Sequence, residues 1–158
     1  MLDPAVFRSV LGRFASGVTV VTLRAPDGRD RGLTVSAFCS LSLGPPLVLA
    51  CVDRQASLHD DFLAASHFGV NILAADQEDV SRRFAEPEAD RFDGLAYQWG
   101  ETGVALLGGV VAQLECRVHT TYDGGDHTIF VGAVLSGRTF NADRPLLYYR
   151  GGYAQLER

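Results

Sequence analysis

Two long strand-like runs, residues 110–122 and 128–140, are joined by a glycine-rich turn. The turn, Asp123-Gly124-Gly125, suits a tight hairpin because glycine reaches the positive φ values that such turns need. This segment therefore predicts two long antiparallel strands. Asp126 and His127 follow the turn at the start of the second strand. They are either a pair that satisfies itself in the turn or one wall of a binding site, and the turn alone does not decide between the two.

The other patterned segments are mostly short strands. They do not alternate with helices as βαβ units, so the expected fold is mainly β, an antiparallel β-barrel with peripheral helices. Besides the hairpin, the expected strands are 18–23, 33–40, 47–51, 68–73 and 146–150. The expected helices are 4–14, capped by Asp3, 57–62, capped by Ser57, and 76–84, whereas 86–103 reads as a long irregular loop.

Composition indicates one globular domain spanning residues 1–158, because 47% of the residues are apolar and 21% are charged. The net charge of -5 argues against nucleic acid as the main partner. No apolar run approaches the roughly 20 residues of a membrane span, and no signal-peptide pattern opens the sequence. Three cysteines without a CxxC pair are typical of a protein of the reducing cytoplasm.

The chain contains no lysine, so all 14 basic residues are arginine. This excludes a lysine Schiff base to pyridoxal phosphate and a Walker A phosphate loop. The sequence also lacks the GxGxxG pattern of a dinucleotide fold and the GxSxG pattern of a serine hydrolase. The four histidines have no zinc-type spacing, so no metal site is expected. Arginine remains available to bind phosphate.

Several polar residues have two interpretations. The alternating hydroxyls of Thr34, Ser36 and Ser40 form either an ordinary solvent-facing row or a polar wall against a ligand. The segment from Cys51 to Ser57 joins a strand end, a charged turn and a helix start, and these together could bind an anion. The basic residues of the second half are either solvated charges or phosphate ligands, and the C-terminal tyrosines either pack or stack on a planar ligand. The residues concerned are Arg82, Arg83, Arg91, Arg150, Tyr148, Tyr149 and Tyr153.

Nearly the whole chain resembles the flavin reductase family, which has the FMN-binding split barrel, a Greek-key-like antiparallel fold. Its members are the small reductase components of two-component flavin-dependent monooxygenases. The Gly-Asp-His segment and the Thr-x-Ser-Ala strand are together quite specific for this family. The resembling segments are 14–22, 32–42, 45–49, 68–73, 84–85, 125–132 and 145–153.

The resemblance implies a homodimer that binds FMN or FAD, reduces it with NADH or NADPH, and supplies reduced flavin to a separate oxygenase. It implies that Gly125, Asp126 and His127 hold the nicotinamide, with Tyr153 nearby, and that His127 is the catalytic residue. The residues that it places around the flavin are Thr34, Ser36, Ala37, Ser40, Val52, Asp53, Ser57 and Phe84.

Two other functions fit the same barrel. One is a non-catalytic flavin-binding or flavin-storage protein. The other is an enzyme resembling pyridoxamine-phosphate oxidase, although its phosphate sites usually include lysine, which this chain lacks.

Overall fold

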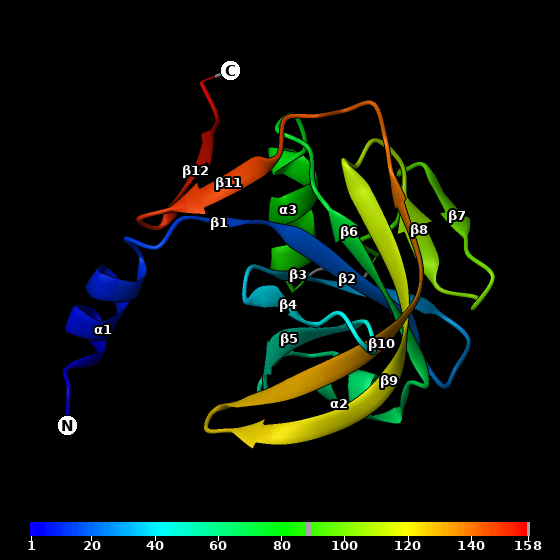
Figure 1. Cartoon of the computed structure of the whole chain (residues 1–158), viewed down its shortest axis with the longest axis horizontal. Coiled ribbons are helices and arrows are strands. Elements are labelled where there is room, and N and C mark those ends of the chain that lie inside the picture. The colour runs from blue at the N-terminus through cyan, green and yellow to red at the C-terminus, as the bar shows by residue number, and fades with distance from the viewer. Residues whose placement is uncertain (88–89, 158) are drawn as a thin grey trace.

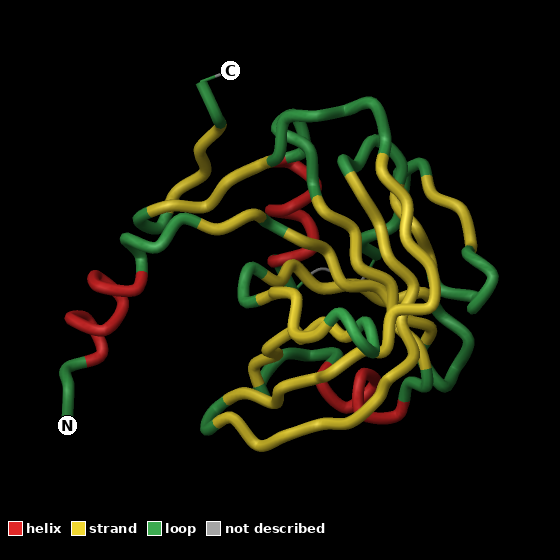
Figure 2. Tube along the Cα trace, in the orientation of Figure 1, coloured by secondary structure: helices red, strands yellow, loops and turns green. Residues whose placement is uncertain are grey.

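Strands dominate the architecture (Figure 2). The computed structural model describes residues 1–87 and 90–157. Seven strands form the main sheet: β2 (Thr19–Arg24), β3 (Asp30–Val35), β4 (Phe38–Ser42), β5 (Leu47–Asp53), β6 (His67–Ile72), β9 (Ala112–Gly124) and β10 (His127–Thr139). Their order is β3-β2-β6-β9-β10-β5-β4, and every neighbouring pair is antiparallel (Figure 1).

The sheet curls into a barrel because its two edge strands, β3 and β4, are joined only by Ser36 and Ala37. The chain turns sharply there, and β3 also lies close to β5. The expected antiparallel barrel is confirmed. The expectation of one continuous strand over 33–40 is wrong, since a straight strand cannot lie at both edges of one sheet.

The hairpin predicted from the glycine-rich turn is also confirmed. The register of β9 against β10 leaves Gly125 and Asp126 as a two-residue turn. Gly125 has a φ of 77° at the first turn position, where type II′ hairpin turns require glycine. The long ribbon lies at the centre of the sheet, with β9 pairing to β6 and β10 pairing to β5.

The remaining elements decorate this barrel. Residues 86–103, expected to be irregular, contain a strand of a small hairpin, and a final strand after residue 151 was not expected. This final strand pairs with the strand before it in a second small hairpin. Both small hairpins, in residues 97–107 and 146–155, are short and depend on packing to form. These elements are α1 (Pro4–Leu11), β1 (Ser16–Gly17), α2 (His59–Ala64), α3 (Glu78–Ala85), β7 (Tyr97–Trp99), β8 (Ala105–Leu107), β11 (Leu146–Tyr149) and β12 (Gly152–Gln155).

The two helix caps expected from the sequence have different outcomes. A side-chain oxygen of Asp3 accepts a hydrogen bond from the Ala5 amide at 2.7 Å, so the first cap is confirmed. The cap expected at Ser57 is wrong, because α2 begins at His59 and no side chain caps it. Ser57 instead lies exposed in the preceding turn.

Aromatic side chains fill the barrel. The rings of Phe62 and Phe130 have centroids 3.9 Å apart, and Phe68 lies 5.2 Å from Phe62. All three are fully buried. A second buried cluster, containing Phe84, fills the space between the sheet and α3. The barrel core thereby fixes α2, and the second cluster fixes α3, against the strands.

Close approach between Phe68 and β10 depends on Gly132. A Cβ atom at this position would lie 2.5 Å from Cζ of Phe68 and 2.9 Å from Cβ of Cys116. Both neighbours are fully buried. Neither has space to move away without disturbing the core.

We therefore expect Gly132→Ala to lower the free energy of unfolding by about 1–3 kcal/mol, the usual effect of overpacking a core. Urea unfolding followed by circular dichroism measures the change. Gly17→Ala is the matched control, because a Cβ there would meet nothing within 4 Å. Equal stability of the two variants would contradict the close packing.

Candidate functional site

Two turns lie side by side at one end of the barrel because β5 pairs with β10. We call them the β5–α2 turn (residues 54–58) and the β9–β10 turn (residues 125–126). His127 stands opposite Asp53 in the sheet. The amide of Arg54 donates a hydrogen bond to the carbonyl oxygen of Asp126 at 3.0 Å, and its guanidinium pairs with the carboxylate of Asp123. The structure thus brings together two segments that are far apart in sequence.

The β9–β10 turn presents a histidine of defined orientation. Nδ1 of His127 lies 2.7 Å from a carboxylate oxygen of Asp126. An ionised carboxylate only accepts hydrogen bonds, so Nδ1 donates and Nε2 is the ring nitrogen left for a ligand. Hydrogen bonding to His127, together with its positive charge when protonated, lowers the pKa of Asp126. Side-chain exposure is 40% for His127, so a ligand can reach the ring.

The other predicted residues in or next to the β5–α2 turn differ in what their side chains do. A side-chain oxygen of Asp53 accepts a hydrogen bond from the Gln55 amide at 2.8 Å and so closes the turn. The Ser57 hydroxyl is exposed. Val52 is only 1% exposed, and its side chain belongs to the core and not to an open surface.

The corner between β3 and β4 lies next to the end of β5 that leads into the β5–α2 turn. The Cys51 amide donates a hydrogen bond to the Ala37 carbonyl at 2.9 Å, which ties the corner to β5. Ser36, Ala37 and Ser40 are all exposed. They therefore present an open surface beside the end of β5.

Thr34 lies on the other side of this corner and is already hydrogen-bonded. Its hydroxyl donates to the carbonyl oxygen of Ser81 in α3 at 2.7 Å. The Ser81 hydroxyl lies 2.7 Å from the hydroxyl of Tyr153. The Arg82 guanidinium lies over the Tyr153 ring, with its Cζ 4.9 Å from the ring centroid. A ligand would therefore meet Thr34 and Tyr153 as members of a network held by α3.

Phe84 supports β3 from beneath. Its side chain is fully buried, and a Cβ at Gly32 would lie 2.7 Å from its ring. It packs against the strand backbone and does not line an open surface. The predicted residues thus form two groups, one around the paired turns and the β3–β4 corner, and one where β3 meets α3.

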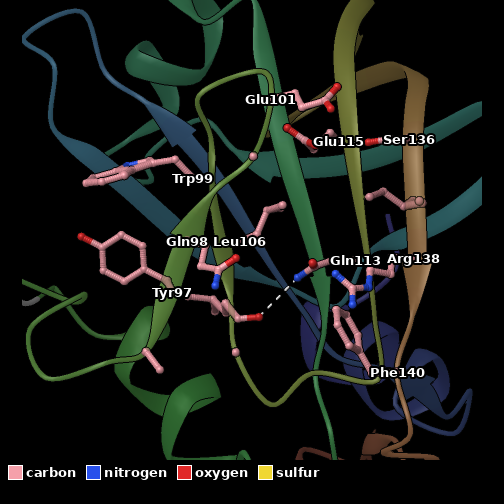
Figure 3. Close-up of a pocket in the computed structure, with 16 residues that line it drawn as sticks. Tyr97, Gln98, Trp99, Glu101, Leu106, Gln113, Glu115, Ser136, Arg138 and Phe140 are labelled. Atoms are coloured by element: carbon pink, nitrogen blue, oxygen red, sulfur yellow. Dashed lines mark hydrogen bonds between the residues drawn. The ribbon is translucent and has the colours of Figure 1, made fainter.

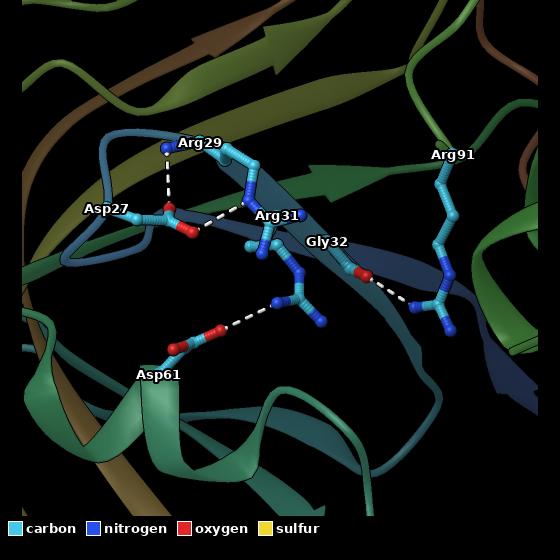
Figure 4. A network of polar contacts seen from close by, with 6 residues as sticks. All are labelled: Asp27, Arg29, Arg31, Gly32, Asp61 and Arg91. Atoms are coloured by element: carbon cyan, nitrogen blue, oxygen red, sulfur yellow. Dashed lines mark hydrogen bonds and ion pairs between the residues drawn. The ribbon is translucent and has the colours of Figure 1, made fainter. Parts of the chain in front are cut away.

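Arg31, in β3, and Arg91 lie near the second group (Figure 4), and Arg91 has an unsatisfied donor. Nη1 of Arg91 donates to the carbonyl oxygen of Gly32 at 2.7 Å. Its Nε is buried without a hydrogen-bond partner among residues 1–87 and 90–157. Burial lowers the pKa of Arg91, and the charge of Arg31 lowers it further. Arg31 pairs with Asp61 of α2 at 2.8 Å.

This arginine pair fits an anion. A buried donor without an acceptor is unfavourable, and the repulsion between the two positive charges would be relieved by an anion bound near them. The sequence named Arg91 as one of several phosphate candidates but did not distinguish it. Arg31 had no signal in the sequence, because its place beside Arg91 comes from folding alone.

A cavity of about 750 Å³ lies between the β7–β8 hairpin and the ends of β9 and β10 farthest from their turn (Figure 3). No predicted site residue lines it. It contains two carboxylates, of Glu101 and Glu115, and one guanidinium, of Arg138. That balance is unfavourable for phosphate-bearing ligands.

Glu115 is already satisfied in this cavity. Burial would raise its pKa, but hydrogen bonds from Thr102 and Ser136 outweigh burial and lower it. The Thr102 hydroxyl lies 2.6 Å from the carboxylate, and the Ser136 hydroxyl lies 3.2 Å away. These contacts anchor the 100–104 loop to the barrel and leave Glu115 no evident catalytic task.

Within residues 1–87 and 90–157, no group of three or more histidine, cysteine or acidic side chains is arranged to hold a metal ion. In the same part of the chain, no helix has the length and apolar character needed to cross a bilayer.

Comparison with known proteins assigns the family. The model of the flavin reductase like domain matches residues 11–157. A flavin reductase of Pseudomonas putida is 41% identical over 152 residues, which cover 96% of this chain and 89% of that protein. The reductase subunit HsaB of a flavin-dependent monooxygenase from Mycobacterium tuberculosis is 41% identical, covering 99% of this chain and 84% of that protein.

Solved structures agree. The NADH:FAD oxidoreductase SgcE6 of Streptomyces globisporus, in complex with NAD and FAD fragments, superposes with a TM-score of 0.92 at 41% identity, covering 99% of this chain and 96% of that one. The flavin reductase fold expected from the sequence is thereby confirmed. Sequence, barrel topology and these relatives agree that the chain belongs to the flavin reductase-like domain family.

Proposed function

We propose that residues 1–158 form a single-domain NAD(P)H:flavin oxidoreductase, of EC 1.5.1 type, that reduces FMN or FAD and supplies reduced flavin to a separate monooxygenase. The observation that carries the proposal is the exposed His127, oriented by Asp126 beside the β5–α2 turn. Family membership supports the same function. Relatives named as NADH-dependent support NADH as the hydride donor.

The β9–β10 turn holds the nicotinamide in this proposal. Nε2 of His127 receives the carboxamide N–H of the nicotinamide, and Asp126 keeps the ring in that orientation. Gly125 has no side chain to obstruct the ligand, and no other atom lies within 4 Å of the position that a Cβ would take. Tyr153, held by Ser81, provides an aromatic face from the second group.

The flavin lies across the β3–β4 corner in this proposal. The exposed corner offers backbone and hydroxyl groups, and Thr34 remains able to accept a hydrogen bond although its proton is given to Ser81. Phe84 acts from beneath by supporting β3, and Val52 by shaping the end of β5. The proposed flavin residues are Thr34, Ser36, Ala37, Ser40, Val52, Asp53, Ser57 and Phe84.

The chemistry itself belongs to the bound cofactors, because the nicotinamide donates a hydride and the flavin accepts it. The chain binds and orients them, so the proposed mechanism requires no covalent nucleophile of the protein. His127 acts as a hydrogen-bonding group at the carboxamide and holds no transferred proton.

Arg91 and Arg31 bind the flavin phosphate in this proposal. The support is the buried, unsatisfied Nε of Arg91 and the proximity of the two cations. Arg31 is linked through Asp61 to α2, the helix that follows the β5–α2 turn. The phosphate is thus bound near the residues proposed for the flavin.

Anaerobic stopped-flow absorbance tests the function, with each flavin crossed against each nicotinamide. We expect NADH to bleach the oxidised flavin band at about 450 nm. His127→Ala should raise the KM for NADH or slow bleaching by roughly tenfold, while flavin affinity stays nearly unchanged. Tight flavin binding without bleaching by wild-type protein would point instead to a flavin-storage protein. Unaltered kinetics in His127→Ala would remove the role of the histidine.

Substitution of Arg91 should weaken binding only of phosphorylated flavins. A charge-assisted hydrogen bond contributes about 2 kcal/mol, so Arg91→Gln should raise the Kd of FMN roughly thirtyfold and leave that of riboflavin unchanged. Fluorescence quenching measures both constants. Arg29→Gln is the matched control. Arg29 is exposed in the turn that leads into β3, and it pairs with Asp27. An equal loss of riboflavin affinity would refute a phosphate contact.

We propose further that two copies associate through the N-terminal arm. No residue of α1 is buried, although Val6, Phe7, Val10 and Leu11 are large and apolar, and α1 projects from the barrel in Figure 1. Such a contiguous apolar face is typical of a protein interface.

Sedimentation equilibrium should therefore give twice the 17.0 kDa chain mass. Phe7→Asp should shift the protein toward monomer, whereas Ser9→Asp, on the polar face of the same helix, should not. A wild-type protein of single-chain mass would contradict the association.

The compartment proposed is the cytoplasm. Cys39, Cys51 and Cys116 are all unpaired thiols. Burial raises the pKa of Cys116 to about 12, with Glu115 adding to the effect, so this thiol stays protonated. Unpaired thiols support a reducing compartment.

A further inference from the structure

A buried hydrogen bond joins the segments that carry the two proposed cofactor turns. Nε2 of His59, the first residue of α2, lies 2.8 Å from the Thr128 hydroxyl in β10. His59 is 7% exposed and Thr128 is 6% exposed. The His59 ring also packs edge-on against Phe130, with centroids 6.1 Å apart.

Both partners lie next to proposed binding residues. Thr128 directly follows His127 in sequence and stands opposite Val52 of β5. His59 comes two residues after Ser57, at the point where the β5–α2 turn becomes a helix. The bond therefore runs from the segment proposed for the flavin to the segment proposed for the nicotinamide.

An ion pair beside the two turns is, in contrast, exposed. Arg54 pairs with Asp123, but their side chains are 46% and 79% exposed. An ion pair in that setting contributes little because water screens it. The bond between His59 and Thr128 is shielded from water, and loss of either partner leaves a buried polar group unsatisfied.

We propose that His59 is a positioning residue, which holds the β5–α2 turn and the β9–β10 turn in fixed relation through Thr128. The inference rests on the proposed function and adds a residue to it. His59 touches neither cofactor, and its effect on both passes through Thr128. Its loss therefore alters flavin and nicotinamide binding together, whereas loss of His127 alters nicotinamide binding alone.

The test measures flavin Kd and NADH KM in the same variants of the full chain. His59→Ala and Thr128→Val should each raise both constants by roughly tenfold, which corresponds to about 1.4 kcal/mol and lies within the cost of leaving a buried polar partner unsatisfied. The double variant should be no worse than either single variant, because both remove the same bond. His59→Gln, which keeps a polar atom near the Nε2 position, should stay within about threefold of wild type.

Thr22→Val is the matched control for stability. The Thr22 hydroxyl donates to the carbonyl oxygen of Ala105 at 2.6 Å and is equally buried, but it lies away from both turns. We expect a similar loss of Tm with unchanged Kd and KM. If Thr22→Val raised Kd and KM as much as His59→Ala does, the changes would follow from lost stability alone. That result would overturn the positioning role.

The remaining outcomes separate this inference from the proposed function. An active wild-type protein whose His59→Ala variant keeps both constants would overturn the inference alone. If His59→Ala fails to fold, Thr128→Val and His59→Gln still decide it through the same two constants. A wild-type protein that NADH does not bleach would overturn the function and the inference together.

Discussion

Backbone pairing along the β9–β10 hairpin is the interaction on which the rest of the barrel depends. β9 also pairs with β6, and β10 with β5, so one ribbon connects both halves of the sheet. The same register places His127 opposite Asp53. A slip by one residue would turn every side chain of the ribbon to the other face. Hydrogen bonds of the backbone therefore bring the two turns together, and the side-chain bond between His59 and Thr128 ties α2 to β10 beside them.

Aromatic rings packed directly on strand backbone give the barrel its shape. Phe68 occupies the space over Gly132, and Phe84 occupies the space under Gly32. In each contact, a ring from another element lies where the Cβ atom of a strand residue would be. Only glycine, which has no Cβ, allows this approach. The second contact couples α3 to the edge strand, and with it the Thr34 hydroxyl that donates to this helix.

Several polar side chains of the proposed site have a structural hydrogen bond already. Asp53 closes its own turn, Thr34 donates to Ser81, and Asp126 orients His127. In the proposed function, recognition of a ligand would fall to the atoms that these bonds do not use, notably Nε2 of His127 and Nε of Arg91. Binding groups held in this way lose little conformational freedom when a ligand arrives.

Local patterns in the sequence determined many of the elements of this protein. Alternation of side chains, the glycine turn and the Asp3 cap act within a few residues, so the hairpin, α1 and the barrel class could be predicted from them. The break at Ser36 and the position of Arg31 near Arg91 could not. They depend on which strand edges meet and on which surfaces lose water, and those arise only when distant segments pack together.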